Sequence, residues 1–401
     1  MANREAGGGI GDAPNFLVVA GEASGDLLAA AAVRAVRRRV PGARFFGMGG
    51  DDARAAGVET IYDAREVAVM GITEVLGRLP GILAALRGLS RLARERRPDA
   101  ALLVDLPDFN LRLARRLKAA GIRVVYYVSP MVWAWRPGRT RRIAACVDEL
   151  CCIYPFEEPF LRERGVRATY VGNPLIETPR PTAEGPAARA ALGADPSLPA
   201  VALLPGSRER EVERLFPAML AAAEQLAAQG PLQAIVPVAP TVDAGRLARL
   251  AAGRRLPVRL VSGKTAEVLA AADAALVASG TATLETLLAG RPMVVVYRVS
   301  WLSWLVGRLL VRVAHVAIVN LLAGRRLVPE LLQGAAKPAA MAEALRGVWR
   351  DAGRRAELLA GYQEVREKLG GPGASERVAA LLLGASAPVD GGEVEAARLV
   401  Q

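Results

Sequence analysis

Short apolar segments alternate with longer amphipathic segments along most of this chain of 401 residues. Apolar runs of strand length lie at residues 16–20, 101–105, 123–128, 200–204, 233–238, 258–261, 274–278 and 293–297. Segments of helical pattern, such as residues 209–228, lie between them. Strands that alternate with helices predict βαβ units, and runs apolar on both faces predict parallel sheets covered by helices on both sides. The pattern therefore predicts an α/β protein.

Length and one change in composition predict two domains. A chain of 401 residues exceeds what one hydrophobic core usually holds. Residues 178–198 are rich in Pro, Ala, Gly and Thr, and the alternation restarts after them. We predict two Rossmann-like domains, at 14–177 and 199–345, joined by a linker at 178–198, with a cleft between them. From Glu330 onwards the pattern is helical only, and residues 385–401 are expected to be a disordered tail.

The composition excludes several kinds of site. The single histidine, His315, rules out histidine-based triads and multi-histidine metal sites and is expected to be structural. Three clustered cysteines (Cys146, Cys151, Cys152) cannot form a disulfide framework and indicate a reducing cytoplasm. The net charge of +12 favours an anionic partner: a nucleic acid, a phosphorylated metabolite or an anionic membrane. We expect neither a signal peptide nor a membrane-spanning helix.

In Rossmann-like sheets, ligands bind beyond the carboxyl ends of the strands. The run at 16–20 is followed by the turn GEASGD at 21–26, whose glycines would let a ligand approach a helix start. The turn is not G-x-G-x-x-G, so a dinucleotide site is unsupported. Ser24 or Asp26 could simply cap the helix. Glu22 has no such structural explanation and is a candidate for activity.

The run at 101–105 ends in DLPDFN at 105–110, which places two carboxylates and an amide together. A buried carboxylate at such a strand end can accept a proton from a hydroxyl nucleophile. Asp108 could instead cap the helix that starts near Phe109. Asp105 is less well explained by a structural role.

Two turns of the second domain are typical of phosphate sites. Residues 204–208 read LPGSR, where Gly206, Ser207 and Arg208 could cradle a diphosphate at a helix start. Residues 279–285 read SGTATLE, and Glu285 could accept the two hydroxyls of a ribose. Either turn could be an ordinary capped loop, but two in one domain favour a nucleotide diphosphate. The SGKT at 262–265 is not a P-loop, because Val258 stands where the first glycine is required.

Aromatic and apolar segments suggest contact with an acylated ligand or a membrane. Trp133 and Trp135 could stack on a ring, line an acyl pocket or form a core corner. Neighbouring arginines would also fit single-stranded nucleic acid, but no nucleic-acid module accompanies them. The segments at 67–83 and 301–313 fit a membrane surface or an ordinary core. The candidate membrane contacts of the first segment are Val69, Met70, Ile72, Val75, Leu76 and Leu79.

Seven short motifs are distributed along the chain. They are AGEASGD at 20–26, VMGITEVL at 69–76, DLPDFN at 105–110, YVSPMVWAW at 127–135, LPGSR at 204–208 with Glu211, SGTATLE at 279–285 and NLLAG at 320–324. Jointly they resemble the lipid-A-disaccharide synthase family over about residues 16–382. The resemblance implies the GT-B architecture of glycosyltransferases, in which two Rossmann-like domains turn their parallel sheets toward a central cleft. It also implies C-terminal helices, here at 346–384, that pack back on the N-terminal domain.

The resemblance further implies an inverting glycosyltransferase of family 19. It would join UDP-2,3-diacylglucosamine to 2,3-diacylglucosamine 1-phosphate (lipid X) and release lipid A disaccharide 1-phosphate and UDP. No metal or cofactor is expected. The implied setting is the cytoplasmic face of the inner membrane, with the enzyme peripheral, without nucleic acid, and as a possible homodimer.

Residues and resemblance together suggest roles for the candidate positions. Asp105 is the preferred base for the acceptor 6-hydroxyl and Asp108 the reserve. Arg208 would neutralise the leaving UDP, and Glu22 matches a family position associated with activity. The UDP-binding candidates are Gly206, Ser207, Arg208, Gly280, Thr281, Thr283, Glu285 and Asn320. The acceptor-binding candidates are Ser24 and Gly25, which could seat its phosphate, with Trp133 and Trp135.

Three positions depart from the family pattern. Tyr126 and Asn173 stand where histidine is common, and Val319 stands where proline is common before Asn320. A histidine role at those positions is therefore absent, which favours a carboxylate base. Two alternatives stay open: a UDP-N-acetylglucosamine 2-epimerase-like enzyme that acts on soluble UDP-sugar, and a non-enzymatic basic protein that binds membranes or polyanions.

Overall fold

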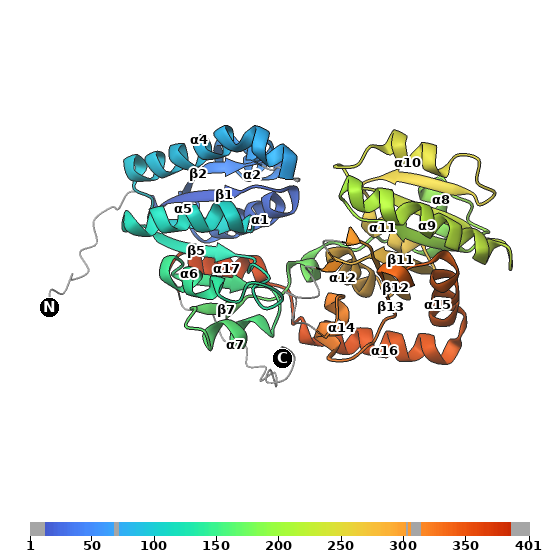
Figure 1. Cartoon of the computed structure of the whole chain (residues 1–401). Helices are drawn as coiled ribbons and strands as arrows, with labels where there is room; N and C mark the ends of the chain where they lie inside the picture. Colours follow the sequence, from blue (N-terminus) through green and yellow to red (C-terminus); the bar gives the residue numbers. More distant parts are fainter. Residues whose placement is uncertain (1–12, 68–71, 302–303, 306–313, 386–401) are drawn as a thin grey trace. The chain divides into compact units, whose positions relative to one another are not determined.

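A computed structural model describes residues 13–67, 72–301, 304–305 and 314–385 (Figure 1). The chain divides into two compact units. The first unit runs to Pro174 and takes up the chain again from Gly371, whereas the second runs from Leu175 to Gly370. Each unit is built around one parallel sheet, as the alternation of strands and helices predicted.

Within the described residues, the first unit holds a seven-stranded sheet in the order β3-β2-β1-β4-β5-β6-β7. Its strands are β1 (Asn15–Ala20), β2 (Arg44–Gly49), β3 (Glu59–Asp63), β4 (Ala100–Val104), β5 (Arg123–Tyr127), β6 (Glu149–Cys152) and β7 (Ala168–Tyr170). Every residue of the central strand β4 is buried, as a parallel sheet covered on both faces requires.

Helices cover both faces of this sheet. They are α1 (Ala23–Arg39), α2 (Asp51–Ala55), α3 (Ala64–Val67), α4 (Ile72–Arg96), α5 (Pro107–Ala119), α6 (Arg139–Cys146), α7 (Glu157–Arg162) and α17 (Ala374–Leu382). The connections β1–β2 and β4–β5 run in opposite directions along the sheet, so right-handed crossovers place α1 and α5 on opposite faces. Helix α17 packs against α1, whereas α4 and α6 flank α5.

The second unit repeats this plan with a sheet of six described strands in the order β10-β9-β8-β11-β12-β13. Its strands are β8 (Ala200–Leu204), β9 (Gln233–Val238), β10 (Val258–Ser262), β11 (Ala274–Ala278), β12 (Met293–Tyr297) and β13 (Glu330–Leu332). Its helices are α8 (Gly185–Ala191), α9 (Glu209–Ala227), α10 (Ala244–Ala251), α11 (Thr265–Ala271), α12 (Thr281–Leu288), α14 (Ile318–Ala323), α15 (Pro338–Arg350) and α16 (Ala352–Lys368). Strands β8 and β11 are buried at every residue.

The eight apolar runs predicted from the sequence are all strands, but five further strands were missed. Strand β2 contains Gly47, which weakens its strand pattern. A Cβ at Gly47 would lie 2.1 Å from the Val18 carbonyl oxygen, so glycine permits this close pairing with β1. Strands β6, β7 and β13 are short, and β3 is an edge strand that is not an apolar run. Strand β13 shows that the chain from Glu330 onwards is not helical only.

The expected linker at 178–198 is not a bare connection but part of the second unit. It contains α8, which packs against α11. The Arg189 side chain on α8 is buried, and its Nη2 donates to Asp273 Oδ2 at 2.7 Å. This long-range ion pair has no local sequence signal, which explains why the composition alone suggested a linker.

The C-terminal helices divide between the units, which corrects the expectation that the whole of 346–384 packs on the N-terminal domain. Helix α17 packs against α1, β4 and β5 of the first unit. Helix α16 belongs to the second unit, where it contacts α14 and α15. Leu358, Tyr362 and Val365 are buried there, and Tyr362 Oη donates to the Arg291 carbonyl oxygen at 3.2 Å.

Most of the two expected membrane segments lies outside the described residues and side chains. Val69 and Met70 lie outside the described residues, as does most of 301–313. Ile72, Val75, Leu76 and Leu79 lie on α4, but their side chains are outside the described part as well. Among the helices that are described, none combines the length and apolar character needed to cross a bilayer.

Candidate active site

Each sheet has one point where the strand order reverses, and all four candidate turns lie at these two points. In the first unit the order reverses between β1 and β4, which are followed by GEASGD and DLPDFN. In the second unit it reverses between β8 and β11, which are followed by LPGSR and SGTATLE. A topological switch point opens a crevice at the carboxyl ends of the strands, where doubly wound sheets bind ligands.

The backbone at Asp105 takes an unusual conformation. Asp105 has φ 50°, and Leu106 has φ 48° and ψ 57°, so two consecutive non-glycine residues are left-handed. Such residues cost about 1–3 kcal/mol each and persist only where the surroundings impose them. Tyr126 Oη donates to the Asp105 carbonyl oxygen at 2.5 Å, and Asn110 Nδ2 donates to the same oxygen at 2.8 Å. Strand β5 and helix α5 therefore hold this turn together.

The neighbouring turn GEASGD makes room for the turn at Asp105 and Leu106. A Cβ at Gly21 would lie 2.4 Å from Leu106 Cδ2, so glycine lets the two turns meet. Gly25 lies against β4, where a Cβ would be 3.7 Å from Val104 Cγ1. Gly21 is thus needed for the close approach of the two turns, whereas a Cβ at Gly25 would make only an ordinary contact.

The Asp105 carboxyl group is partly buried at this point. Burial raises its pKa, and a hydrogen bond from the Leu106 backbone amide only partly offsets the rise. In the described part of the chain Asp105 forms no ion pair. Burial, with the nearby Asp105 carboxylate, also raises the pKa of Tyr126 well above its usual value, so the phenol stays protonated as a donor. A carboxylate with a raised pKa at a strand end has the properties of a general base.

Asp108 has a different environment, although it is three residues away. Its side chain is 79% exposed and its Oδ1 accepts from Arg139 Nη2 at 2.7 Å. Leu106, not Asp108, occupies the N-cap of α5, and no side chain caps that helix. The expectation that Asp108 caps the helix is therefore wrong.

The carboxylates of GEASGD also have distinct positions. Glu22 is the N-cap residue of α1 without a capping side-chain bond, so neither Ser24 nor Asp26 caps this helix. Asp26 is buried, and its carboxylate accepts from the backbone amides of Gly50 at 2.6 Å and Asp52 at 2.9 Å. Asp26 thus ties α1 to the start of α2. Glu22 is partly exposed and Ser24 exposed at the switch point.

The two tryptophans separate into a core residue and a surface residue. Trp133 is 6% exposed and packs edge-on against Phe156, with ring centroids 5.0 Å apart. Its Nε1 donates to Glu157 Oε1 at 2.9 Å. Little of the ring is exposed, and acceptor binding by Trp133 stays a prediction. Trp135 is 37% exposed, and the Arg136 guanidinium lies 4.4 Å from its ring centroid.

Glu157 is a buried acid that the sequence analysis missed. Besides Trp133, it accepts from the backbone amides of Ile153 and Tyr154, both at 3.1 Å. Burial raises its pKa to about 7 despite these donors. Ile153 and Tyr154 lie in the loop directly after β6, so Glu157 holds this loop in place.

In the second unit, LPGSR is shaped by Gly206. This residue has φ 107°, and a Cβ there would lie 2.2 Å from Glu211 Oε2. Arg208 is the N-cap of α9, and Ser207 and Arg208 are both exposed. The Ser207 carbonyl oxygen accepts from Thr241 Oγ1 at 2.5 Å, which fixes the turn. The free amides of α9 and the Arg208 charge therefore lie at the carboxyl end of β8, as an anion site requires.

The SGTATLE turn begins α12 at Thr281, which is exposed. Thr283 is fully buried, and its hydroxyl donates to the Gly280 carbonyl oxygen at 2.7 Å. This bond holds the Thr283 hydroxyl within the turn, and UDP binding by Thr283 stays a prediction. Gly280 and Thr281 remain accessible at the amino end of α12.

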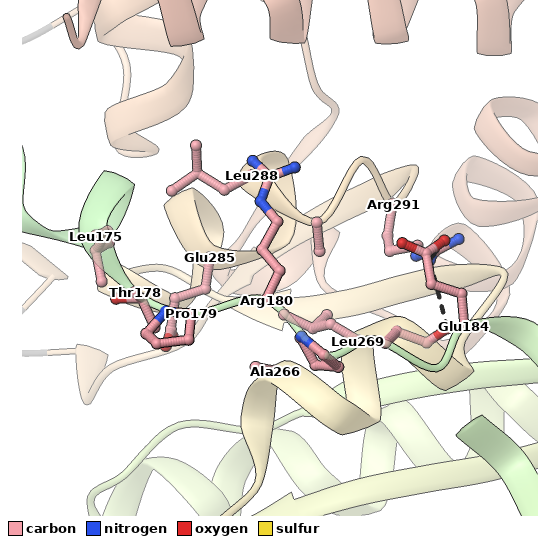
Figure 2. Close-up of a pocket in the computed structure, with 13 residues that line it drawn as sticks. Leu175, Thr178, Pro179, Arg180, Glu184, Ala266, Leu269, Glu285, Leu288 and Arg291 are labelled. Atoms are coloured by element: carbon pink, nitrogen blue, oxygen red, sulfur yellow. Dashed lines mark hydrogen bonds and ion pairs between the residues drawn. The ribbon is translucent and has the colours of Figure 1, made fainter. Parts of the chain in front are cut away.

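Glu285 lines a cavity of about 80 Å³ in the second unit (Figure 2). Figure 2 shows Glu285, Thr178 and Pro179 grouped on one side of this cavity and the ion pair between Glu184 and Arg291 on the other. The remaining lining is mostly apolar, from α11 and α12. Burial raises the pKa of Glu285.

Asn320 is fully buried and its amide is committed to its own unit. Nδ2 donates to the Val328 carbonyl oxygen at 3.0 Å and to Glu330 Oε1 at 2.6 Å, and Oδ1 accepts from the Val328 amide at 2.9 Å. UDP binding by Asn320 stays a prediction, and these bonds show that its amide is held within the second unit. Glu330, which the sequence analysis did not single out, also accepts from the amides of Val316 and Ala317, so the pair organises the chain after His315.

The remaining departures from the family pattern also have structural partners. Asn173 is buried, and its Nδ2 donates to the Ile153 carbonyl oxygen at 3.2 Å. Val319 is buried on α14. Among the described residues, no group of three or more His, Cys, Asp or Glu side chains could hold a metal ion.

Comparison with solved structures gives the fold. The chain is similar to the UDP-GlcNAc 2-epimerase from Neisseria meningitidis bound to UDP-GlcNAc, with a TM-score of 0.63 at 11% identity over 92% of this chain and 100% of that one. It is also similar to CalG4, the calicheamicin glycosyltransferase, with a TM-score of 0.56 at 19% identity over 94% and 100%. These likenesses confirm the GT-B class of two Rossmann-like domains.

Comparison of sequences gives the family. The model of the family described as lipid-A-disaccharide synthetase matches residues 16–381. The lipid-A-disaccharide synthase of Myxococcus xanthus (strain DK1622) is 54% identical over 92% of this chain and 97% of its own. That of Anaeromyxobacter sp. (strain K) is 56% identical over the same shares. The chain therefore belongs to the lipid-A-disaccharide synthase family and is a glycosyltransferase of lipid A biosynthesis.

Proposed function

We propose that the enzyme transfers diacylglucosamine from UDP-2,3-diacylglucosamine to the 6-hydroxyl of 2,3-diacylglucosamine 1-phosphate (lipid X). The products are the β-1,6-linked disaccharide 1-phosphate and UDP. The observation that carries the proposal is the difference between the two switch points: a partly buried carboxylate in the first unit and an arginine with two helix amino ends in the second. A single displacement with inversion needs one base and one stabilised leaving group.

In the first unit, Asp105 is the proposed base. A carboxylate oxygen of Asp105 takes the proton of the acceptor 6-hydroxyl. At the same time the oxygen of that hydroxyl attacks the anomeric carbon of the donor sugar. The C–O bond to UDP breaks on the opposite face, so the configuration inverts. Asp108 is a poor alternative, because its carboxylate is exposed and paired with Arg139. Glu22, Ser24, Gly25 and Trp135 are proposed to contact the acceptor sugar.

In the second unit, the diphosphate is proposed to lie at the amino ends of α9 and α12. The Gly206 and Ser207 amides and the Arg208 guanidinium would neutralise charge as UDP leaves. Gly280 and Thr281 would supply further donors. Glu285 would accept the ribose hydroxyls, since it is a partly buried carboxylate one turn into α12.

The acyl chains of both substrates require contact with a lipid phase. We propose that the enzyme works as a peripheral protein on the cytoplasmic face of the inner membrane, through the segment that holds Val69 to Leu79. The apolar composition of that segment supports this proposal.

The test is UDP release by purified enzyme from UDP-2,3-diacylglucosamine, with and without lipid X, and analysis of the product linkage. UDP release that requires lipid X, with a β-linked product, is expected. An α-linked product would contradict inversion. UDP release or sugar isomerisation that is indifferent to lipid X would contradict the transferase and favour the epimerase-like alternative.

A further inference from the structure

A second concave site lies in the first unit, beside the Asp105 turn. It is a groove of about 590 Å³ between α4, α5 and α6, a volume typical of small-molecule sites. Leu83, Leu86 and Leu111 line part of it. The charged residues that line it are Asp108, Arg112, Arg115, Arg116, Arg139 and Arg142, a net charge of +4.

The arginines of this groove come from one face of α5 and from α6. Asp108, Arg112 and Arg115 follow one another at helical spacing, so they share a face of α5. Arg139 and Arg142 stand on α6 across from them. Side chains from two helices therefore line one concavity, in which Arg112, Arg115 and Arg142 are exposed.

Several of these arginine side chains form no ion pair or hydrogen bond with other described residues. Arg139 is paired with Asp108, and Arg116 Nη1 donates to the Leu86 carbonyl oxygen at 3.3 Å. The side chains of Arg112, Arg115 and Arg142 form neither an ion pair nor a hydrogen bond anywhere in the described part of the chain. Gathering unpaired like charges around a cavity costs free energy unless an anion is bound.

The groove reaches the proposed reaction centre. Pro107 and Asp108 line it, and they come shortly after Asp105 in the chain. Arg112 lies one turn along α5 from Asp108, a rise of about 6 Å. A phosphate on Arg112 and Arg142 would therefore sit roughly one sugar ring away from the Asp105 turn. Leu83 and Leu86 continue along α4, whose earlier part is the apolar segment proposed to meet the membrane.

We propose that this groove binds the phosphomonoester of the acylated sugar acceptor, with Arg112 and Arg142 as its main ligands. The inference rests on the proposed function for the identity of the acceptor. It replaces the amino end of α1 as the phosphate site. A helix end carries only about half a positive charge, and here Glu22 is the N-cap residue and Asp26 lies in the first turn. The leucines would contact the acyl part of the same molecule.

The test compares three forms of the full-length enzyme in neutral detergent micelles: wild type, Arg112→Gln with Arg142→Gln, and Arg34→Gln with Arg44→Gln. The second pair is a matched control, because both residues are exposed arginines of the same unit and the charge change is equal. Binding of lipid X and of its dephosphorylated counterpart is measured without donor. We expect the groove variant to bind lipid X at least about tenfold more weakly, or about 1.4 kcal/mol. Its affinity for the dephosphorylated molecule and the control variant's affinities should not change.

Three outcomes would overturn the proposal. The groove variant could bind lipid X normally, or it could lose both molecules equally. It could also keep its preference for the phosphorylated acceptor but lose binding to phosphatidylcholine vesicles that contain phosphatidylglycerol, which would assign the groove to membrane headgroups. If wild type prefers the phosphorylated molecule through these arginines but does not glycosylate it, the groove assignment stands and the proposed function fails.

Discussion

The two switch points occupy the same place in two copies of one architecture, yet their chemistry is opposite. At the end of β4, Asp105 is held in a left-handed backbone by Tyr126 and Asn110, and burial raises its pKa. At the ends of β8 and β11, the accessible groups are Arg208, Thr281 and the amides of two helix starts. One point is suited to take up a proton and the other to hold an anion. The comparison teaches that the fold supplies the position, whereas a few side chains after each strand decide the chemistry.

The largest effect in the second unit is expected from Arg208→Gln. Loss of one preorganised charge at a leaving group typically costs about 10²–10³ in kcat. The matched control is Arg210→Gln, which removes the same charge from the same exposed turn of α9. Steady-state rates of UDP release measure both. Equal losses in the two variants would show that the effect is general charge and not the site.

The turn at Asp105 in the first unit can be perturbed without changing the Asp105 carboxylate. Tyr126→Phe removes one of the two donors to the Asp105 carbonyl oxygen, and we expect stability to fall by about 1 kcal/mol. If the donor positions the base, kcat should also fall, by roughly tenfold. Tyr362→Phe is the control, because it removes a similar buried hydroxyl bond in the second unit. Urea unfolding and kcat are measured for both; a fall in kcat for Tyr362→Phe, or none for Tyr126→Phe, contradicts the positioning role.

Two threonines of one turn test which hydroxyl faces the ligand. Thr281→Val should raise the KM for the UDP-sugar a few-fold, because an exposed donor at the amino end of α12 is lost. Thr283→Val should instead lower stability by about 1 kcal/mol, since its hydroxyl serves the Gly280 carbonyl oxygen. Titration of initial rates and thermal unfolding separate the two effects. The reverse assignment would show that the turn is used differently.

The buried acid Glu157, which lies outside the proposed site, provides the smallest expected effect on activity. Glu157 has a pKa of about 7 in the folded protein and an ordinary one when unfolded, so the native state binds more protons between these values. Its contribution is therefore greatest below the unfolded pKa and is lost as pH rises toward about 7, on the order of 3 kcal/mol. Glu157→Gln should remove this slope from urea unfolding at pH 5 to 8, while kcat stays within about twofold. An unchanged slope would refute the assignment.

Sequence patterns predicted the turns at the two switch points better than the surroundings of individual side chains. The turns after the strands were predicted because strand ends and helix starts follow from local periodicity. For Thr283, Asn320 and Trp133 no local pattern indicated the internal partner of each side chain, because that partner is a backbone group or lies far along the chain. Asn320 binds Val328 and Glu330, and Trp133 binds Glu157.

Features that depend on tertiary packing were missed for the same reason. The arginine groove needs α4, α5 and α6 to be side by side, which no single segment encodes. The left-handed turn at Asp105 depends on the Tyr126 hydroxyl from β5. Helix α8 is held by the distant Asp273, so its segment had the composition of a linker.

The most direct test of the account is UDP release with both substrates by wild type, Asp105→Asn and Asp108→Asn in one assay. The two variants lose the same charge three residues apart, but only Asp105 is partly buried with a raised pKa, whereas Asp108 is exposed and paired with Arg139. We predict that Asp105→Asn lowers kcat by about 10²–10⁴ with UDP binding unchanged, and that Asp108→Asn stays within a few-fold of wild type. An active Asp105→Asn variant beside an inactive Asp108→Asn variant would contradict the account.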